Sequence, residues 1–414
     1  MTYQLLGGLR VVESSAFIAA PLAGLTLAQY GADVIRIDMI GGGLDYARLP
    51  RMPGGRSLYW TGLNKGKRSV AVDLRHPEGR DLVQALVTAP GQDSGVLLTN
   101  IATPWLDHEL LARRRADVIS CVIQGNADGS TALDYTVNCA AGYPAMTGNG
   151  SLRNPINHAL PAWDLACAYQ AAFAVLAAVT QRRQTGKGAA LRIALSDVAF
   201  TALSHLGMLA EAQLLQHDRP AIGNHIYGAF GRDFACADGH RVMVAAISIG
   251  QWEALVKACD AGAAIAALEQ RLGLDFRDEA QRYEAREAIA ALLEPWFAAR
   301  PRVGVEAELE RHRVCWGRYS TVRELLESDS RVGVANPVFE MAYTPGVGAH
   351  LAAGATARIA GHERQPTPAA PLLGTHTDEV LNEVLGFDSS AIGRLHDRGI
   401  VAGPQRDPSL RNKE

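Results

Sequence analysis

The sequence predicts an α/β fold with a parallel sheet and more than one domain. Short runs rich in Val, Ile and Leu alternate with helical patterns over the first 125 residues, the order typical of strands connected by crossover helices. Parallel strands are covered on both faces, so their sequences are nearly continuous apolar runs, as several are here. The chain has 414 residues, more than one ordinary core holds, and we therefore expect two domains.

Residues at the helix boundaries and short apolar runs locate the elements of the first half. A helix over 20–30 ends at Gly31, a residue suited to the position after a helix, and a helix over 77–89 begins with Pro77 in its first turn. A further helix runs to about Arg113. The predicted strands of this part are 9–13, 33–38, 69–74, 95–100, 118–123 and 191–195, and the later helices are 165–179 and 196–216.

The pattern changes after residue 217. Residues 218–248 are rich in Gly, Pro and Asn, and Ala237-Asp238-Gly239-His240 is typical of a hairpin turn. Helical patterns dominate 251–312, and short strands return from about 330, before helices at 377–385 and 389–398 and a loose tail over the last dozen residues. We predict that 1–217 is the first part of a large domain, that 218–330 is a smaller α+β domain, and that 331–414 is the return to the large domain with a C-terminal tail.

Composition excludes several classes of function. Hydrophobic residues make up 48% and charged residues 20%, and the formal net charge of −3 gives no basic surface for nucleic acid or anionic membranes. The six cysteines are scattered without a C-x-x-C pair, which favours reduced thiols over disulfides. The first residues lack the features of a signal peptide, and the apolar stretch at 165–179 is short and rich in alanine. We expect a cytoplasmic protein that binds neither nucleic acid nor membranes.

The standard phosphate and metal motifs are missing. Residues 41–43 lack the G-x-G-x-x-G spacing, and residues 62–68 lack the P-loop spacing and its Ser or Thr. Lys65, Lys67 and Arg68 fit either a phosphate contact through charge or a solvated basic turn. The 12 histidines include no H-E-x-x-H or comparable cluster, so no metal site is expected.

Asp164 stands directly ahead of the apolar run at 165–179. One interpretation is a helix N-cap, since backbone N–H groups and the helix dipole favour negative charge there. The other is a nucleophilic carboxylate that forms covalent acyl intermediates. If Asp164 caps the helix, we expect the same N–H groups to lower its pKa. We also expect backbone N–H groups near the helix start to stabilise oxyanions.

Several segments together resemble the class III CoA-transferases, the family of formyl-CoA transferase and α-methylacyl-CoA racemase. The run at 66–79 carries the family signature, and further matches lie at 31–38, 185–188 and 371–381, in the family's order. The resemblance implies a Rossmann-like large domain formed by both chain ends, a smaller α+β domain, and an interlocked-ring homodimer. It also implies an acyl-CoA substrate and no separate cofactor, because coenzyme A is part of the substrate.

The resemblance assigns site residues by position. Asp164 falls on the family's catalytic aspartate. The residues that fall on contacts to CoA or to the rest of the substrate are Phe17, Ile18, Arg48, Val72, Asp73, Leu74, Arg75, Asn100 and Ile101.

Some segments depart from other members of the family. After Asn100 the chain is shorter than in formyl-CoA transferase, so a basic phosphate contact has no clear counterpart, and the glycine-rich loop of the small domain is missing. Leu133 precedes Asp134 where the racemases place a catalytic His, which argues against racemisation.

Segments 15–21, 41–46, 62–68 and 160–164 resemble the members that move CoA between the two carboxyl groups of mesaconate. This implies an intramolecular transfer through an aspartyl anhydride and an aspartyl-CoA thioester. The alternatives are an intermolecular transferase that uses another acid and a CoA-binding protein without activity. A nicotinamide dehydrogenase is disfavoured by the failed dinucleotide fingerprint.

Overall fold

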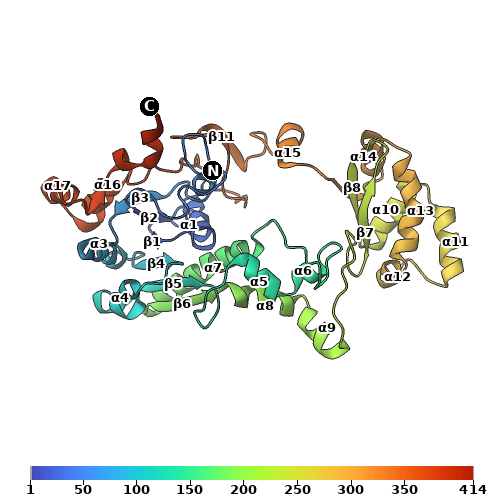
Figure 1. Ribbon diagram of the computed structural model, residues 1–414, viewed down its shortest axis with the longest axis horizontal. Coiled ribbons are helices and arrows are strands. Elements are labelled where there is room, and N and C mark those ends of the chain that lie inside the picture. The colour runs from blue at the N-terminus through green and yellow to red at the C-terminus, as the bar shows by residue number, and fades with distance from the viewer. Residues whose placement is uncertain (1, 414) are drawn as a thin grey trace. The chain divides into compact units, whose positions relative to one another are not determined.

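A computed structural model describes residues 2–413 and divides them into two compact units (Figure 1). The larger unit is built from both ends of the chain, as the resemblance implied: residues up to Ala141, Ala159–Ala210, and Ser330 onward. The smaller unit contains Gly142–His158 and Glu211–Asp329. Residues 142–158 therefore differ from the predicted ranges, which placed them in the large domain. Residues 142–158 are joined to the smaller unit by a backbone bridge in which Gly223 N donates to Gly148 O at 2.7 Å. Residues 211–217, which the prediction also placed in the large domain, belong to the smaller unit as well.

The larger unit contains a seven-stranded sheet in the order β12-β3-β2-β1-β4-β5-β6. Neighbouring strands are parallel except at the edge, where β12 runs antiparallel to β3. The α/β prediction is confirmed. The strands are β1 Arg10–Ser14, β2 Asp33–Met39, β3 Arg68–Val72, β4 Val96–Thr99, β5 Ile119–Gln124, β6 Ala189–Ala194 and β12 Val401–Ala402, and a separate hairpin joins β10 Phe339–Thr344 and β11 Gly348–Ala353.

Helices cover both faces of the sheet. Val12 of β1 belongs to a core that includes residues of α3, α4 and α16, whereas its neighbour Glu13 faces α1. Helix α1 approaches so closely that a Cβ on Gly24 would lie 1.7 Å from Glu13 Oε2, so this position requires glycine. The helices of this unit are α1 Ala19–Gln29, α2 Leu58–Leu63, α3 Pro77–Thr88, α4 His108–Arg114, α5 Asp134–Ala140, α7 Ala162–Thr185, α8 Leu195–His205, α16 Thr377–Leu385 and α17 Ser389–Asp397.

A buried ion network lies between β1, β2 and α1. Glu13 accepts from Arg36 Nη1 at 3.0 Å and pairs with Lys67 Nζ at 2.9 Å, and Arg36 Nε donates to Asp38 Oδ1 at 2.8 Å. Each of these four side chains is at most 3% exposed. Burial lowers the pKa of Lys67 to about 8, and it raises the pKa of Asp38.

Neither predicted role of the basic turn is correct. Lys67 is buried in the ion network, and Lys65 is also buried and donates to Ala353 O at 3.0 Å. Arg68 pairs with Asp33, Glu379 and Glu383. Lys65 and Arg68 bind partners from the C-terminal part of the sequence, whereas Lys67 binds Glu13 and Pro21 O.

Two further sequence predictions are wrong, one about an unbroken helix over 196–216 and one about a loose C-terminal tail. The helix predicted over 196–216 is interrupted at Gly207, whose φ of 74° breaks the helical path between α8 and α9 Met208–Leu215. The tail is ordered as far as it is described: Asp407 is fully buried and accepts hydrogen bonds from Tyr46 Oη at 2.6 Å and Leu373 N at 2.7 Å.

The smaller unit packs helices against a three-stranded antiparallel sheet, β7-β8-β9. The predicted turn at 237–240 joins β7 to β8 and is confirmed, with Gly239 at φ 80°. Aromatic side chains, among them Phe230, Phe234, Trp252 and Phe297, fill its core. Its elements are α6 Tyr143–Met146, β7 Phe230–Ala235, β8 Arg241–Ala246, α10 Ile249–Ala258, α11 Gly262–Leu272, α12 Glu279–Glu284, α13 Arg286–Ala298, α14 Arg302–Arg311, β9 Cys315–Arg318 and α15 Val322–Ser328.

One described helix, α7, is long and apolar enough to cross a membrane by length and composition alone. Core helices of soluble proteins meet the same criteria, and the face of α7 that includes Cys167, Ala171 and Val175 is buried against the rest of the larger unit.

Replacing Glu13 tests the ion network. Glu13→Gln keeps the shape but leaves the cations of Arg36 and Lys67 under-compensated in the interior, so we expect a loss of about 2–4 kcal/mol in the free energy of unfolding at pH 7. Equilibrium urea denaturation measures it. Arg323→Ala, which breaks an exposed pair with Glu327, is the matched control and should leave the midpoint unchanged. Equal midpoints for both variants and the wild type would contradict the network's role.

Candidate active site

A cavity of about 400 Å³ opens in the larger unit at the carboxyl ends of β1, β4 and β5. Ligands of open α/β sheets bind at this edge. Its wall combines apolar side chains with a few polar ones, the mixture typical of small-molecule sites. The lining residues are Phe17, Ile18, Ala19, Arg48, Tyr59, Asn100, Ile123, Gln124, Gly125, Ala132, Leu133, Asp134, Tyr135, Asp164 and Leu195.

Asp164 is the half-buried carboxylate of this cavity. It is the third residue of α7, and no hydrogen bond from another described residue reaches its carboxylate. Burial, reinforced by the negative charge of Asp134 and opposed by Arg48, raises the pKa of Asp164 to about 7. The prediction that the helix start lowers this pKa is wrong, because desolvation outweighs the helix dipole.

Asp134, not Asp164, caps α7. Its Oδ2 accepts from Trp163 N at 2.7 Å and from Asp164 N at 3.1 Å. The residue at the N-cap position itself, Pro161, makes no side-chain cap. The N-cap interpretation of Asp164 is therefore wrong, and so is the expectation that these amides stabilise oxyanions, because Asp134 already occupies them. These two bonds hold the backbone at Asp164, and the Asp164 carboxylate takes no part in the cap.

The loop at Phe17 is held in an unusual conformation. Phe17 has φ 65°, the left-handed region that non-glycine residues rarely adopt. Its N–H donates to Asp45 Oδ2 at 2.9 Å, and Asn100 bonds the preceding residue twice, to Ala16 N at 2.9 Å and Ala16 O at 2.7 Å. Strain of this kind persists where the surroundings over-determine it, commonly at functional sites.

The structure brings together five of the ten predicted site residues: Asp164, Phe17, Ile18, Arg48 and Asn100 all line the cavity. Ile101 lines an adjacent hollow of about 250 Å³, which shares Gln124 with the cavity. Val72, Asp73, Leu74 and Arg75 lie outside the cavity, at the end of β3 and two strands away from β1. There Arg75 is exposed and pairs with Asp73 at 3.0 Å.

Sequence reasoning missed two lining residues with clear chemistry. Tyr59 lies in α2, a short helix that no periodic pattern indicated. Asp134 was noticed only as the neighbour of Leu133. A carboxylate in the first turn of a short helix is a common surface feature, so the burial of Asp134, which is 3% exposed, was not visible in the sequence.

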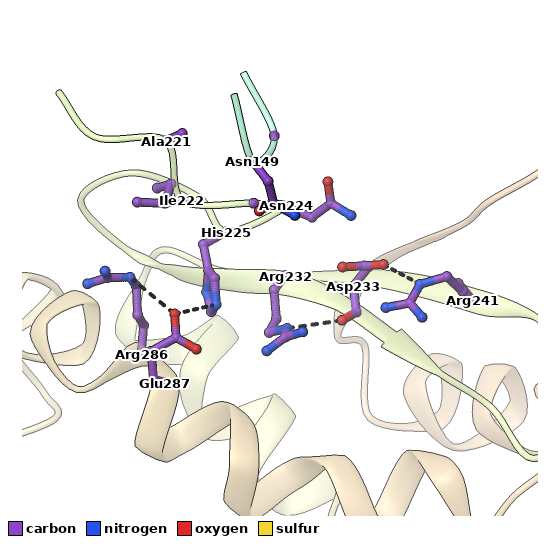
Figure 2. Close-up of a pocket in the computed structure, with 12 residues that line it drawn as sticks. Asn149, Ala221, Ile222, Asn224, His225, Arg232, Asp233, Arg241, Arg286 and Glu287 are labelled. Carbon is purple, nitrogen blue, oxygen red and sulfur yellow. Dashed lines mark hydrogen bonds and ion pairs between the residues drawn. The ribbon is translucent and has the colours of Figure 1, made fainter. Parts of the chain in front are cut away.

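The smaller unit has a separate polar cavity of about 450 Å³ (Figure 2). Its carboxylates are already paired inside it: Asp233 with Arg241, and Glu287 with His225 Nε2 at 3.2 Å and Arg286 Nε at 3.9 Å. No residue that the sequence singled out as a site lies here. Among residues 2–413, no group of three or more His, Cys, Asp or Glu side chains is arranged to hold a metal ion.

The raised pKa of Asp164 predicts a pH-dependent stability difference. Its folded pKa of about 7 lies above the ordinary value of 3.8, so the free energy of unfolding falls as pH rises between these values. Asp164→Asn removes that loss and should stabilise the protein by about 1–2 kcal/mol at pH 8 but not near pH 4. Thermal melts of both proteins across this range measure the difference. Asp397→Asn, an exposed carboxylate, is the control, and a pH-independent difference for Asp164→Asn would contradict the raised pKa.

Comparison with known proteins places this site in a family. The model of CoA-transferase family III matches residues 6–377. The chain is 51% identical over 404 residues to the 2-methylfumaryl-CoA isomerase of Chloroflexus aurantiacus, covering 97% of this chain and 99% of that protein. It is 26% identical to a formyl-CoA:oxalate CoA-transferase of Rhodopseudomonas palustris, covering 97% and 98% of the two chains.

Solved structures agree with the sequence matches. The crystal structure of a CaiB/BaiF family protein from Brucella suis superimposes with a TM-score of 0.75 at 25% identity, covering 92% of this chain and 100% of that one. The family match spans most of the described residues, including the cavity with Asp164. The chain belongs to CoA-transferase family III.

Proposed function

We propose that the protein is an intramolecular CoA transferase that converts 2-methylfumaryl-CoA, the C1 thioester of mesaconate, into 3-methylfumaryl-CoA, the C4 thioester. The observation that carries this proposal is the unpaired Asp164 carboxylate in the cavity of a chain 51% identical, over nearly its whole length, to a 2-methylfumaryl-CoA isomerase. A carboxylate is the nucleophile that this chemistry needs, because an anhydride and a thioester are of comparable reactivity.

The first half of the reaction detaches CoA from C1. An Asp164 oxygen attacks the C1 carbonyl and expels the CoA thiolate, which leaves a mixed anhydride between Asp164 and C1. The thiolate then attacks Cγ of Asp164 and breaks the Cγ–O bond to the bridging oxygen. The products are an aspartyl-CoA thioester and free mesaconate, whose C1 carboxylate keeps that oxygen.

The second half runs the same steps at the other end of the acid. Mesaconate turns end for end, and its C4 carboxylate attacks Cγ of Asp164 and expels the thiolate. The thiolate attacks the C4 carbonyl of the new anhydride, forms the C4 thioester and releases Asp164 as a carboxylate. Bonds and charges balance at each step without a redox or metal cofactor.

The cavity supplies what these steps require. Desolvation makes the Asp164 carboxylate more basic, and a more basic carboxylate is a stronger nucleophile once deprotonated. The apolar wall, which includes Ile18, Ile123 and Leu195, limits access of water, which would hydrolyse each intermediate. The cap from Asp134 fixes the backbone from which Asp164 attacks.

Intermolecular transfer is the alternative, and the 26% identity to a formyl-CoA:oxalate CoA-transferase supports it. The intramolecular route does not require the acid to leave, which fits the absence of the glycine-rich loop. Incorporation of labelled free mesaconate into product, or dependence of the rate on an added acid, would favour the alternative. The interlocked homodimer and the cytoplasmic location stay predictions from the sequence.

The direct test is incubation with the C1 thioester of mesaconate. We expect the C4 isomer to form, and rapid quenching followed by mass spectrometry should find CoA or an acyl group on the peptide that contains Asp164. Asp164→Asn should lower the rate by about 10³-fold or more, because the amide is a poor nucleophile. Asp397→Asn should keep full activity. Isomer formation by the Asp164→Asn variant at the wild-type rate, or no isomer from the wild type, rejects the proposal.

Asp134 offers a pH test of the nucleophile. Because only the deprotonated carboxylate attacks, kcat/KM should rise with pH through the Asp164 pKa near 7 and then level off. Asp134→Asn keeps an oxygen that accepts the two N–H bonds but removes the negative charge that raises this pKa. The acid limb should therefore shift to lower pH, with higher relative activity at about pH 6. An unshifted limb would show that Asp164 does not govern the profile.

A further inference from the structure

Arg48 is held on one wall of the cavity by two aromatic rings. Its guanidinium carbon lies 5.4 Å from the centre of the Phe17 ring and 5.3 Å from that of Tyr59, distances at which a cation is attracted to the ring face. It is the one Lys or Arg among the described residues that line the cavity, and no acidic side chain of residues 2–413 forms an ion pair with it. The residue is exposed, so an incoming group can reach its donors.

Tyr59 adds a donor on the same wall. Its hydroxyl is buried and has no hydrogen-bond partner among the described residues, an arrangement that costs free energy unless a ligand completes it. Burial, together with the negative charge of Asp164, raises the pKa of Tyr59, so the phenol keeps its proton and donates. The cavity thus presents a guanidinium and an unused O–H donor beside the nucleophilic carboxylate.

We propose that Arg48 and Tyr59 form a carboxylate-binding subsite, which holds the free carboxyl group of a dicarboxylic acyl thioester while the other carboxyl group reacts at Asp164. This inference rests on the proposed function and names the residues that select a dicarboxylic acid. A guanidinium offers parallel N–H donors that match both oxygens of a carboxylate, and the phenol supplies a further bond.

The subsite serves both halves of an isomerisation. When Asp164 attacks C1, Arg48 and Tyr59 hold the C4 carboxylate. After the acid turns end for end, they hold the C1 carboxylate while C4 reacts. The same cation therefore binds either carboxylate of the acid while Asp164 reacts with the other. Between the two half-reactions, it holds the released dicarboxylate in the cavity.

A phosphate of CoA is a second anion that an arginine can bind, and the test separates the two sources. Mesaconyl-CoA and crotonyl-CoA carry the same CoA, but crotonyl-CoA has no free carboxylate. For each thioester, the rate of adduct formation on Asp164 is measured by rapid quenching and mass spectrometry, so that the comparison does not require isomer formation.

For mesaconyl-CoA we expect Arg48→Gln to lower kcat/KM of adduct formation by about 10- to 100-fold, mainly through KM, since the carboxylate is bound before and during reaction. Arg48→Lys should recover part of this loss through its charge, and Tyr59→Phe should lose about 5- to 10-fold. With crotonyl-CoA, each variant should stay within about threefold of the wild type. Arg51→Gln, an exposed arginine outside the cavity lining, should match the wild type on both thioesters.

Two results overturn the subsite itself, and a third removes the mechanism on which it rests. An equal loss on both thioesters assigns Arg48 to a CoA phosphate or to structural support of the Phe17 loop. No loss for Arg48→Gln on mesaconyl-CoA shows that the pair does not bind the acyl carboxylate. No adduct from either thioester with the wild type rejects covalent transfer through Asp164, and the subsite is rejected with it. A wild type that forms the mesaconyl adduct faster than the crotonyl adduct but makes no C4 isomer rejects the proposed function and leaves the subsite standing.

Discussion

The buried ion network between β1, β2 and α1 is the constraint on which the cavity depends. Arg36 is its centre, since it binds Glu13 and Asp38 and lies 3.7 Å from Asp45 Oδ2. Asp45 in turn accepts from Phe17 N, and its carbonyl accepts from Arg48 N at 3.1 Å. Buried charges and the Asp45 backbone therefore connect the strands of the sheet to two of the segments that line the cavity, those of Phe17 and Arg48. Burying these charged groups costs desolvation free energy, and the network in return holds Phe17 and Arg48 in defined positions.

At Asp164, too, the structure carries a group whose burial costs stability. A carboxylate held by its helix N–H groups would be stable and weakly basic, but Asp134 takes those donors instead. The Asp164 carboxylate is left half-desolvated beside another negative charge, and this raises its pKa toward neutrality. The structure thus gives up some stability at neutral pH, and in the proposed mechanism the gain is a more reactive nucleophile.

The sequence was enough to predict the sheet and the division of the larger unit between both chain ends, and to single out Asp164, which the structure places in the wall of the cavity. Those features depend on apolar runs, turn residues and an extended family resemblance, which are local or additive signals. The roles of Lys65, Lys67 and Arg68 were not predictable, because their partners lie as far away in sequence as Ala353, Glu379 and Glu383. The capping role of Asp134 and the orphan hydroxyl of Tyr59 also depend on tertiary contacts, and the pKa of Asp164 follows from burial that no residue spacing reveals.

Oxygen transfer through Asp164 is the central claim of the mechanism, and isotope labelling tests it directly. With the C4 carboxylate of the C1 thioester labelled with oxygen-18, one turnover should leave one heavy oxygen on the Asp164 carboxylate. It should also place one unlabelled oxygen from Asp164 in the C1 carboxylate of the product. Mass spectrometry of the peptide that contains Asp164 and of the product measures both. A complete single turnover that leaves Asp164 unlabelled and both heavy oxygens in the product would contradict covalent transfer through this residue.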